Sequence, residues 1–253
     1  MRTLHETNLI FRRAMRLSLR NPIWVILGLI QPILYLTMFG PLLENMTRVH
    51  GWPTGDPWQV FVPGLLVQLG IFGAAFVGFG LVAEMRAGVV ERMRVTPASR
   101  LALLLGRVLR DVVVLLVQGV ILVACAELFG LDAPLAGLVL GLLVVAALGA
   151  AFSSASYAAA LMLKSEDALA PLANGLAVPL LLLSGILLPM SLAPGWLEAI
   201  SDANPVKHVV DGVRALFLEG SVTMTVVWGV VATLGLVAAG LALGTRTFER
   251  ESG

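Results

Sequence analysis

The sequence predicts an all-α integral membrane protein, and two properties of the whole chain lead to that class. Of the 253 residues, 58% are hydrophobic and only 13% are charged, which is about half the charged share of a soluble domain. The mean hydropathy is +0.92. Six stretches are apolar and long enough to cross a hydrocarbon core about 30 Å thick as helices. We therefore expect one membrane domain, residues 23–253, with six transmembrane helices in contact with lipid.

The first 22 residues predict an amphipathic helix that lies in the membrane interface. At 100° per residue its polar side chains share one face and most apolar side chains the other, with Leu9 as the exception. Asn21-Pro22 then turns the chain into the first span. A basic flank that only sets topology is the alternative explanation. The polar face consists of Arg2, His5, Glu6, Arg12, Arg13, Arg16 and Arg20.

The expected spans are residues 23–43, 60–83, 112–129, 138–162, 169–188 and 222–243. An even number of crossings places both termini on one side. That side would carry fourteen of the 17 Lys and Arg residues, and cytoplasmic segments carry the excess of positive charge. We therefore expect both termini in the cytoplasm. Richness in arginine beside just two lysines suggests a bacterial genome, and so a bacterial plasma membrane.

A charged island, residues 84–110, separates the second and third spans. It mixes acidic and basic residues, beginning at Glu84, and must therefore face water. Thr96 suits a helix N-cap and Pro97 the first helical position, so residues 84–100 predict a helix, an elbow and a second helix. A solvated loop that only fixes the topology is the alternative.

The stretch between the fifth and sixth spans, residues 189–221, is too apolar for a wholly solvated loop. It predicts short helices that dip back into the outer leaflet as a re-entrant segment. Asp211 and Arg214 stand three residues apart on such a helix and are expected to pair, stabilising an extracellular lid.

Two separated motifs resemble one family, the type-2 ATP-binding cassette (ABC) permeases, above all the daunorubicin-resistance and nodulation-type exporters. The first lies in the charged island and the second between the last two spans. They read Glu84-x3-Gly88-x2-Glu91-Arg92-Met93-x2-Thr96-Pro97-x-Ser99-Arg100 and Ser184-Gly185-Ile186-Leu187-Leu188-Pro189, the latter followed by Asn204-Pro205, Asp211-Gly212 and Arg214.

The resemblance implies a role for each motif. The segment between the second and third spans would be a coupling helix that docks on an ABC ATPase, and Ile186 and Leu187 would close the outer end of a central cavity. Two copies of the chain and two ATPase subunits would form the exporter, although a heterodimer with a related permease is an alternative. The coupling residues would be Glu84, Gly88, Glu91, Arg92, Thr96 and Pro97.

The sequence has no glycine-rich loop ending in Lys-Ser or Lys-Thr, so the chain is not expected to bind ATP or to be an enzyme. If the resemblance holds, ATP and Mg²⁺ belong to the separate ATPase. The three histidines are far apart in sequence, and we expect no metal site, no other cofactor and no nucleic-acid partner.

A few polar residues inside the expected spans are candidates for substrate contact: Ser153, Ser156 and Asn174. Interhelical hydrogen bonding is the alternative role for such residues. The expected cargo is hydrophobic, drug-like or lipid-like, and polysaccharide or other polar cargo is the alternative. A proton-coupled secondary transporter would need acids in mid-span, whereas Glu127 lies near the outer end of the third span, where a transport role stays open.

Overall fold

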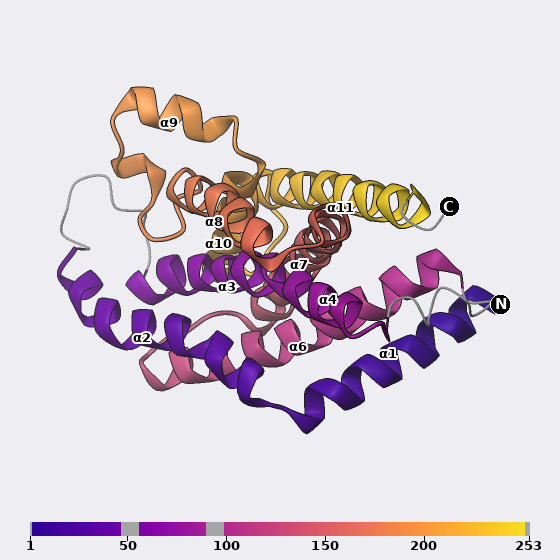
Figure 1. Cartoon of the computed structure of the whole chain (residues 1–253). Coiled ribbons are helices and arrows are strands. Elements are labelled where there is room, and N and C mark those ends of the chain that lie inside the picture. Colours follow the sequence, from indigo (N-terminus) through magenta and orange to yellow (C-terminus); the bar gives the residue numbers. More distant parts are fainter. Residues whose placement is uncertain (1, 47–55, 90–98, 251–253) are drawn as a thin grey trace.

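The computed structural model describes residues 2–46, 56–89 and 99–250, and these residues fold into helices without a strand (Figure 1). The helices stack side by side as one elongated bundle. In chain order they are α1 (Arg2–Arg20), α2 (Ile23–Met46), α3 (Pro57–Ala75), α4 (Val77–Arg86), α6 (Arg100–Leu128), α7 (Leu135–Leu163), α8 (Glu166–Leu182), the 3-10 turn η1 (Met190–Leu192), α9 (Gly195–Asp202), α10 (Pro205–Glu219) and α11 (Met224–Arg250).

Each expected span overlaps one helix or, for residues 60–83, two, but the helical segments differ in whether they are long enough to cross a membrane. Among the described residues four segments are long and apolar enough: 57–86, 100–128, 135–163 and 224–248. The bent pair α1–α2, with 68° between its arms, would make a fifth. Helix α8 has 17 residues and is therefore about 25 Å long, short of the hydrocarbon thickness. The chain is thus a multi-pass membrane protein, and the sixth span stays a prediction.

Helix α7 lies at the centre of the bundle and packs against α3, α6, α10 and α11. Glycines allow the closest of these contacts. A Cβ on Gly240 of α11 would lie 2.4 Å from the carbonyl oxygen of Ala151 in α7, and a Cβ on Gly137 of α7 would lie 1.9 Å from that of Leu216. Such close backbone approach is typical of helix pairs in membranes, where van der Waals packing drives association.

The second expected span is broken into α3 and α4 at Phe76. The break interrupts the helical hydrogen bonds, and Ser156 of α7 replaces part of what is lost. Its hydroxyl donates to the Ala75 carbonyl at 2.6 Å and accepts from the Gly78 N–H at 3.0 Å. Because hydrocarbon cannot satisfy free backbone groups, this serine stabilises the broken helix.

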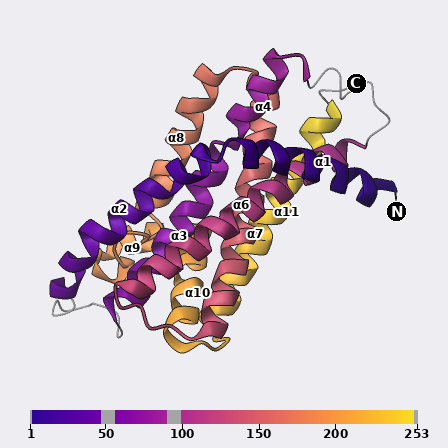
Figure 2. The ribbon, with the colours of Figure 1, turned by 90° about the horizontal axis from the view of Figure 1, so that it is seen from below.

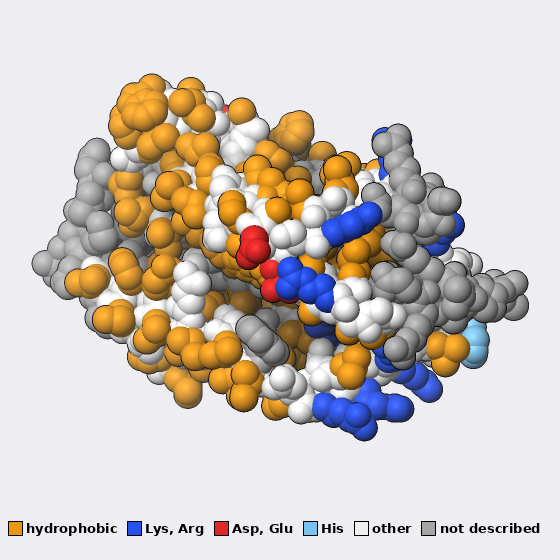
Figure 3. Space-filling view, viewed as in Figure 1, with side chains coloured by type: hydrophobic (Ala, Val, Ile, Leu, Met, Phe, Trp, Pro, Cys, Tyr) orange, Lys and Arg blue, Asp and Glu red, His pale blue; other side chains and the backbone are white. Residues whose placement is uncertain are grey.

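Both termini lie at the same end of the bundle, where α4 ends and α6 begins, and α9 lies at the opposite end (Figures 1 and 2). An even number of crossings would give this arrangement. Lys and Arg side chains gather toward the end that carries the termini (Figure 3). That distribution is the one expected for the cytoplasmic end of a membrane protein.

The α7–α11 contact can be tested with two glycines of the same helix. Gly240→Ala should lower the free energy of unfolding by about 1–3 kcal/mol, because the new methyl group would overlap the Ala151 carbonyl. Gly235→Ala should be neutral or stabilising, because nothing lies within 4 Å of its Cβ position. Unfolding of the purified variants in detergent micelles would measure both, and equal effects would contradict the packing described.

Candidate functional site

A groove of about 1010 Å³ lies between α1 and α2 on one side and α3, α4 and α6 on the other. Helix α8 contributes only Glu166 to its lining. In the space-filling view the groove is the hollow near the middle of the face, with acidic and basic side chains at its edge (Figure 3). The site is therefore built within one subunit.

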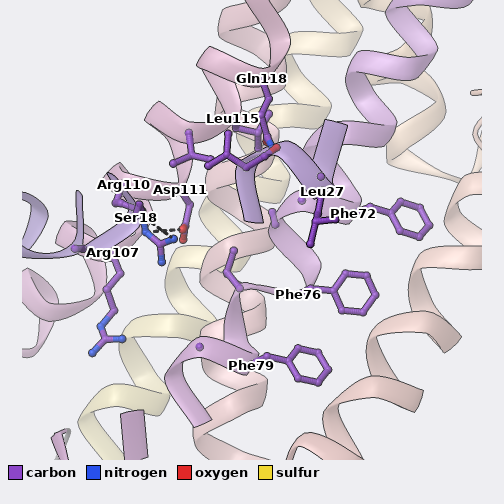
Figure 4. A pocket seen from close by; sticks show the side chains of 18 of the residues that line it. Ser18, Leu27, Phe72, Phe76, Phe79, Arg107, Arg110, Asp111, Leu115 and Gln118 are labelled. Carbon is purple, nitrogen blue, oxygen red and sulfur yellow. Dashed lines mark hydrogen bonds and ion pairs between the residues drawn. The ribbon is translucent and has the colours of Figure 1, made fainter. Parts of the chain in front are cut away.

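One side of the groove carries a row of three phenylalanines, Phe72, Phe76 and Phe79 (Figure 4). Their spacing of four and three residues places them on one helical face across the α3–α4 break. The ring centroids are 6.5 Å apart for the first two and 5.8 Å apart for the last two. All three side chains are half-buried, so part of each ring remains open to a ligand, to lipid or to another chain.

The other side of the groove holds a buried network around Asp111 of α6 (Figure 4). Tyr157 of α7 donates to its carboxylate at 2.6 Å, and Arg110 forms an ion pair with it at 3.1 Å. Arg110 also donates to the Tyr157 and Ser18 hydroxyls, at 3.4 Å each. Opposite charges and hydrogen bonds make it possible to keep an acid inside the bundle.

Two further contacts join the helices at the end of the bundle that carries the termini. Arg107 of α6 forms an ion pair with Glu84 of α4 at 2.6 Å. The backbone N–H of Ser99, which caps α6, donates to the Glu6 carboxylate of α1 at 2.8 Å. Together with the Arg110–Ser18 contact, these interactions connect α1, α4 and α6.

The expected coupling residues fall partly on this junction. Glu84 forms the ion pair with Arg107. Gly88 has a φ of +67°, a left-handed conformation that glycine adopts without steric cost. The other four, Glu91, Arg92, Thr96 and Pro97, lie outside the described residues. The docking role of the whole set stays a prediction.

At the opposite end, Arg214 of α10 fastens α10 and the turn after α8 to α3. It is fully buried and donates to the carbonyls of Val60 at 2.9 Å and Gly185 at 2.6 Å, with a longer bond of 3.4 Å to that of Ile186. The Ile186 side chain is therefore enclosed in the core of its own subunit, whereas Leu187 is half-buried. Of the two expected gate residues, Ile186 is therefore buried and Leu187 is more accessible.

The expected pair of Asp211 and Arg214 is present, with 3.8 Å between the carboxylate and the guanidinium. Its part in a lid stays a prediction. Nearby, the Lys207 ammonium bonds to the Asp202 carboxylate and holds the pKa of that carboxyl below its usual range. The first pair lies within α10 and the second joins the end of α9 to α10, so both stabilise this part of the chain locally.

The residues proposed for substrate contact do not line the groove. Ser153 is fully buried, Ser156 bridges the α3–α4 break, and Asn174 is exposed and donates to the Ala170 carbonyl of its own helix at 3.1 Å. Glu127 is exposed at the end of α6. Within the described part of the chain, no three His, Cys, Asp or Glu side chains are placed to hold a metal.

Sequence reasoning missed two groove residues, Gln68 and Asp111. Gln68 is a strongly polar side chain inside an apolar span, a signal that was available in the sequence. Asp111 falls between the charged island, which ends at Arg110, and the third expected span, which begins at residue 112, and so it was assigned no role. Its burial depends on Tyr157, which is 46 residues away.

A transporter family and several known transport permeases match most of this chain. The family described as ABC-2 type transporter matches residues 5–218. The daunorubicin resistance ABC transporter permease protein DrrB1 of Streptomyces coeruleorubidus is 27% identical over 242 residues, covering 95% of this chain and 84% of that protein. The doxorubicin resistance permease DrrC of Mycobacterium tuberculosis is 25% identical over 250 residues, 96% and 88% of the two chains. The transport permease ycf38 of Cyanophora paradoxa is 27% identical over 204 residues, 80% and 70%.

The buried network can be tested with the two tyrosines of the chain. Tyr157→Phe should lower the free energy of unfolding by about 2 kcal/mol, because it removes a hydrogen bond to a buried carboxylate. Tyr35→Phe, which removes only a bond of 3.3 Å from the exposed Gln31, should change it by less than about 0.5 kcal/mol. Unfolding in detergent micelles measures both, and a neutral Tyr157→Phe would contradict a tightly paired Asp111.

Proposed function

The chain belongs to the ABC-2 type transporter family and is a membrane permease subunit, and we propose that it exports a hydrophobic, drug-like or lipid-like substrate. The substrate would leave the cytoplasm or inner leaflet of a bacterial plasma membrane, with both termini in the cytoplasm. A separate ABC ATPase, as the family implies, would bind ATP and Mg²⁺. Two relatives are named for daunorubicin and doxorubicin resistance, which supports drug-like cargo.

The junction of α1, α4 and α6 is the observation that best supports coupling to an ATPase. The coupling segment, residues 84–100, connects the end of α4 to the start of α6. The Arg107–Glu84 ion pair joins these helices, and the Glu6–Ser99 contact adds α1. A push on the coupling segment would therefore move three helices together, as a rigid body shifting between two arrangements.

The proposed exporter contains two copies of the chain and two ATPase subunits. The exposed faces of α2 and α8, rich in apolar side chains, are available to lipid or to a second copy. ATP binding would close the ATPases, and the shift would open the outer constriction. Ile186 anchors that turn in its own subunit, so Leu187 is the member of the pair that a second copy could meet.

The groove favours hydrophobic over polysaccharide cargo, because most of its lining is apolar and includes three phenyl rings. It also favours ATP over proton coupling. Asp111, its most deeply buried acid, is already paired with Arg110 and Tyr157, so taking up a proton would disrupt two interactions. An acid that carries protons must be free to exchange them.

The coupling role can be tested by exchanging two charges that the family resemblance places at the ATPase. The double variant Glu91→Arg with Arg92→Glu keeps the net charge and therefore the topology signal, but it reverses both local charges. Co-purification with an ABC ATPase from the same gene cluster should weaken at least about tenfold, since like charges would face each other. ATP-dependent transport in proteoliposomes should fall in parallel.

A matched exchange on the same expected side of the membrane serves as the control. Arg246→Glu with Glu249→Arg swaps the same two charges at the end of α11, outside the coupling segment in sequence. It should leave assembly and transport unchanged. Unimpaired assembly and transport in the Glu91 and Arg92 variant would refute the coupling role.

A further inference from the structure

Gln68 of α3 is a polar side chain that the fold leaves without a partner. It is 1% exposed and lines the groove, and neither its amide oxygen nor its amide nitrogen has a hydrogen-bond partner among the described residues. Leu65, Leu66, Val67 and Leu69 around it are all buried and apolar. An unpaired buried amide lowers stability, so packing alone would favour leucine here.

Gln118 of α6 shows what a structural amide looks like in the same groove. It is also buried, but it donates to the Val25 carbonyl of α2 at 2.8 Å and so ties two helices together. Gln68 makes no such hydrogen bond between helices among the described residues. Its amide therefore keeps one acceptor and two donors without a partner among the described residues.

The charges that line the groove balance, with Arg13, Arg107 and Arg110 against three carboxylates, and so favour an uncharged occupant. Its lining includes three carboxylates, and each forms an ion pair with an arginine, at 2.6, 3.1 and 3.3 Å. A cationic ligand would have to displace one of these arginines to reach an acid. The pairs are Glu84 with Arg107, Asp111 with Arg110, and Glu166 with Arg86.

The size and the aromatic side of the groove narrow the ligand further. A volume of about 1010 Å³ is at the upper end of the range for pockets that hold drug-sized molecules. The row of Phe72, Phe76 and Phe79 provides faces and edges against which a flat aromatic system can pack (Figure 4).

We propose that the groove is a binding site, within one subunit, for an uncharged amphiphile with an aromatic face and a carbonyl or hydroxyl group that bonds to Gln68. Export of that ligand rests on the proposed function. Binding does not, because it can be measured on the purified chain without an ATPase. A chain that binds but assembles with no ATPase would refute only the proposed function.

The test uses 4-hexylbenzophenone, an uncharged aryl ketone that attaches covalently to nearby C–H bonds under near-ultraviolet light. The full chain is reconstituted in lipid nanodiscs and labelled, and mass spectrometry of its peptides locates the adducts. Labelling of α3 is divided by labelling of the exposed face of α11, which corrects for probe dissolved in lipid. We expect this ratio to be well above one and to saturate with probe concentration.

Gln68→Leu should lower the ratio about fivefold, the effect of losing one hydrogen bond. Its melting temperature without probe should equal or exceed that of the unmodified chain, because the unpaired amide is gone. Gln59→Leu removes an amide from the same helix outside the groove, where it donates to the Asp132 carbonyl. It should leave the ratio unchanged.

Three results would overturn the proposal. The first is a ratio that Gln68→Leu does not change. The second is a fall in the melting temperature of Gln68→Leu together with the ratio, which would make Gln68 a structural residue. The third is stronger labelling of the groove by 4-benzoylbenzyl-trimethylammonium, a cationic benzophenone, which would mean that the paired acids do receive a cation.

Discussion

Hydrocarbon offers no hydrogen bonds, and so every charged or strongly polar side chain inside this bundle needs a partner from another part of the chain. Arg214 meets this constraint at one end by binding carbonyls of α3 and of the turn after α8. Asp111 meets it at the other end through its neighbour Arg110 and through Tyr157 of α7. Because Tyr157 and the carbonyls bound by Arg214 belong to other elements, these contacts also fix how the helices pack.

The same pairings divide the molecule into parts suited to transport. At the end that carries the termini, ion pairs and hydrogen bonds hold α1, α4 and α6 together, where the proposed coupling segment leaves α4 and enters α6. At the other end, Arg214 fastens the turn that carries Ile186 and Leu187. The groove lies between α1, α2, α3, α4 and α6. A movement of the coupling segment would therefore change the shape of the groove.

The sequence allowed prediction of what depends on local pattern. The apolar stretches correspond to helices, and Asp211 and Arg214 pair because they are three residues apart. A helix was expected to begin near Pro97 and α6 begins at Arg100, but the third span was placed only from residue 112, because Arg107 and Arg110 look solvent-exposed until their distant partners Glu84 and Tyr157 are known. The carbonyl partners of Arg214 and the groove beside Gln68 likewise arise only when α3 meets α10 and α2.

This permease subunit is proposed to move an uncharged amphiphile at the expense of ATP hydrolysed by another chain. The most direct measurement is uptake of 4-hexylbenzophenone into inside-out proteoliposomes that contain the chain and its ATPase, with ATP or a non-hydrolysable analogue. Uptake should require hydrolysis and be insensitive to a protonophore. Uptake that persists without the ATPase and collapses with the proton gradient would contradict ATP-driven export.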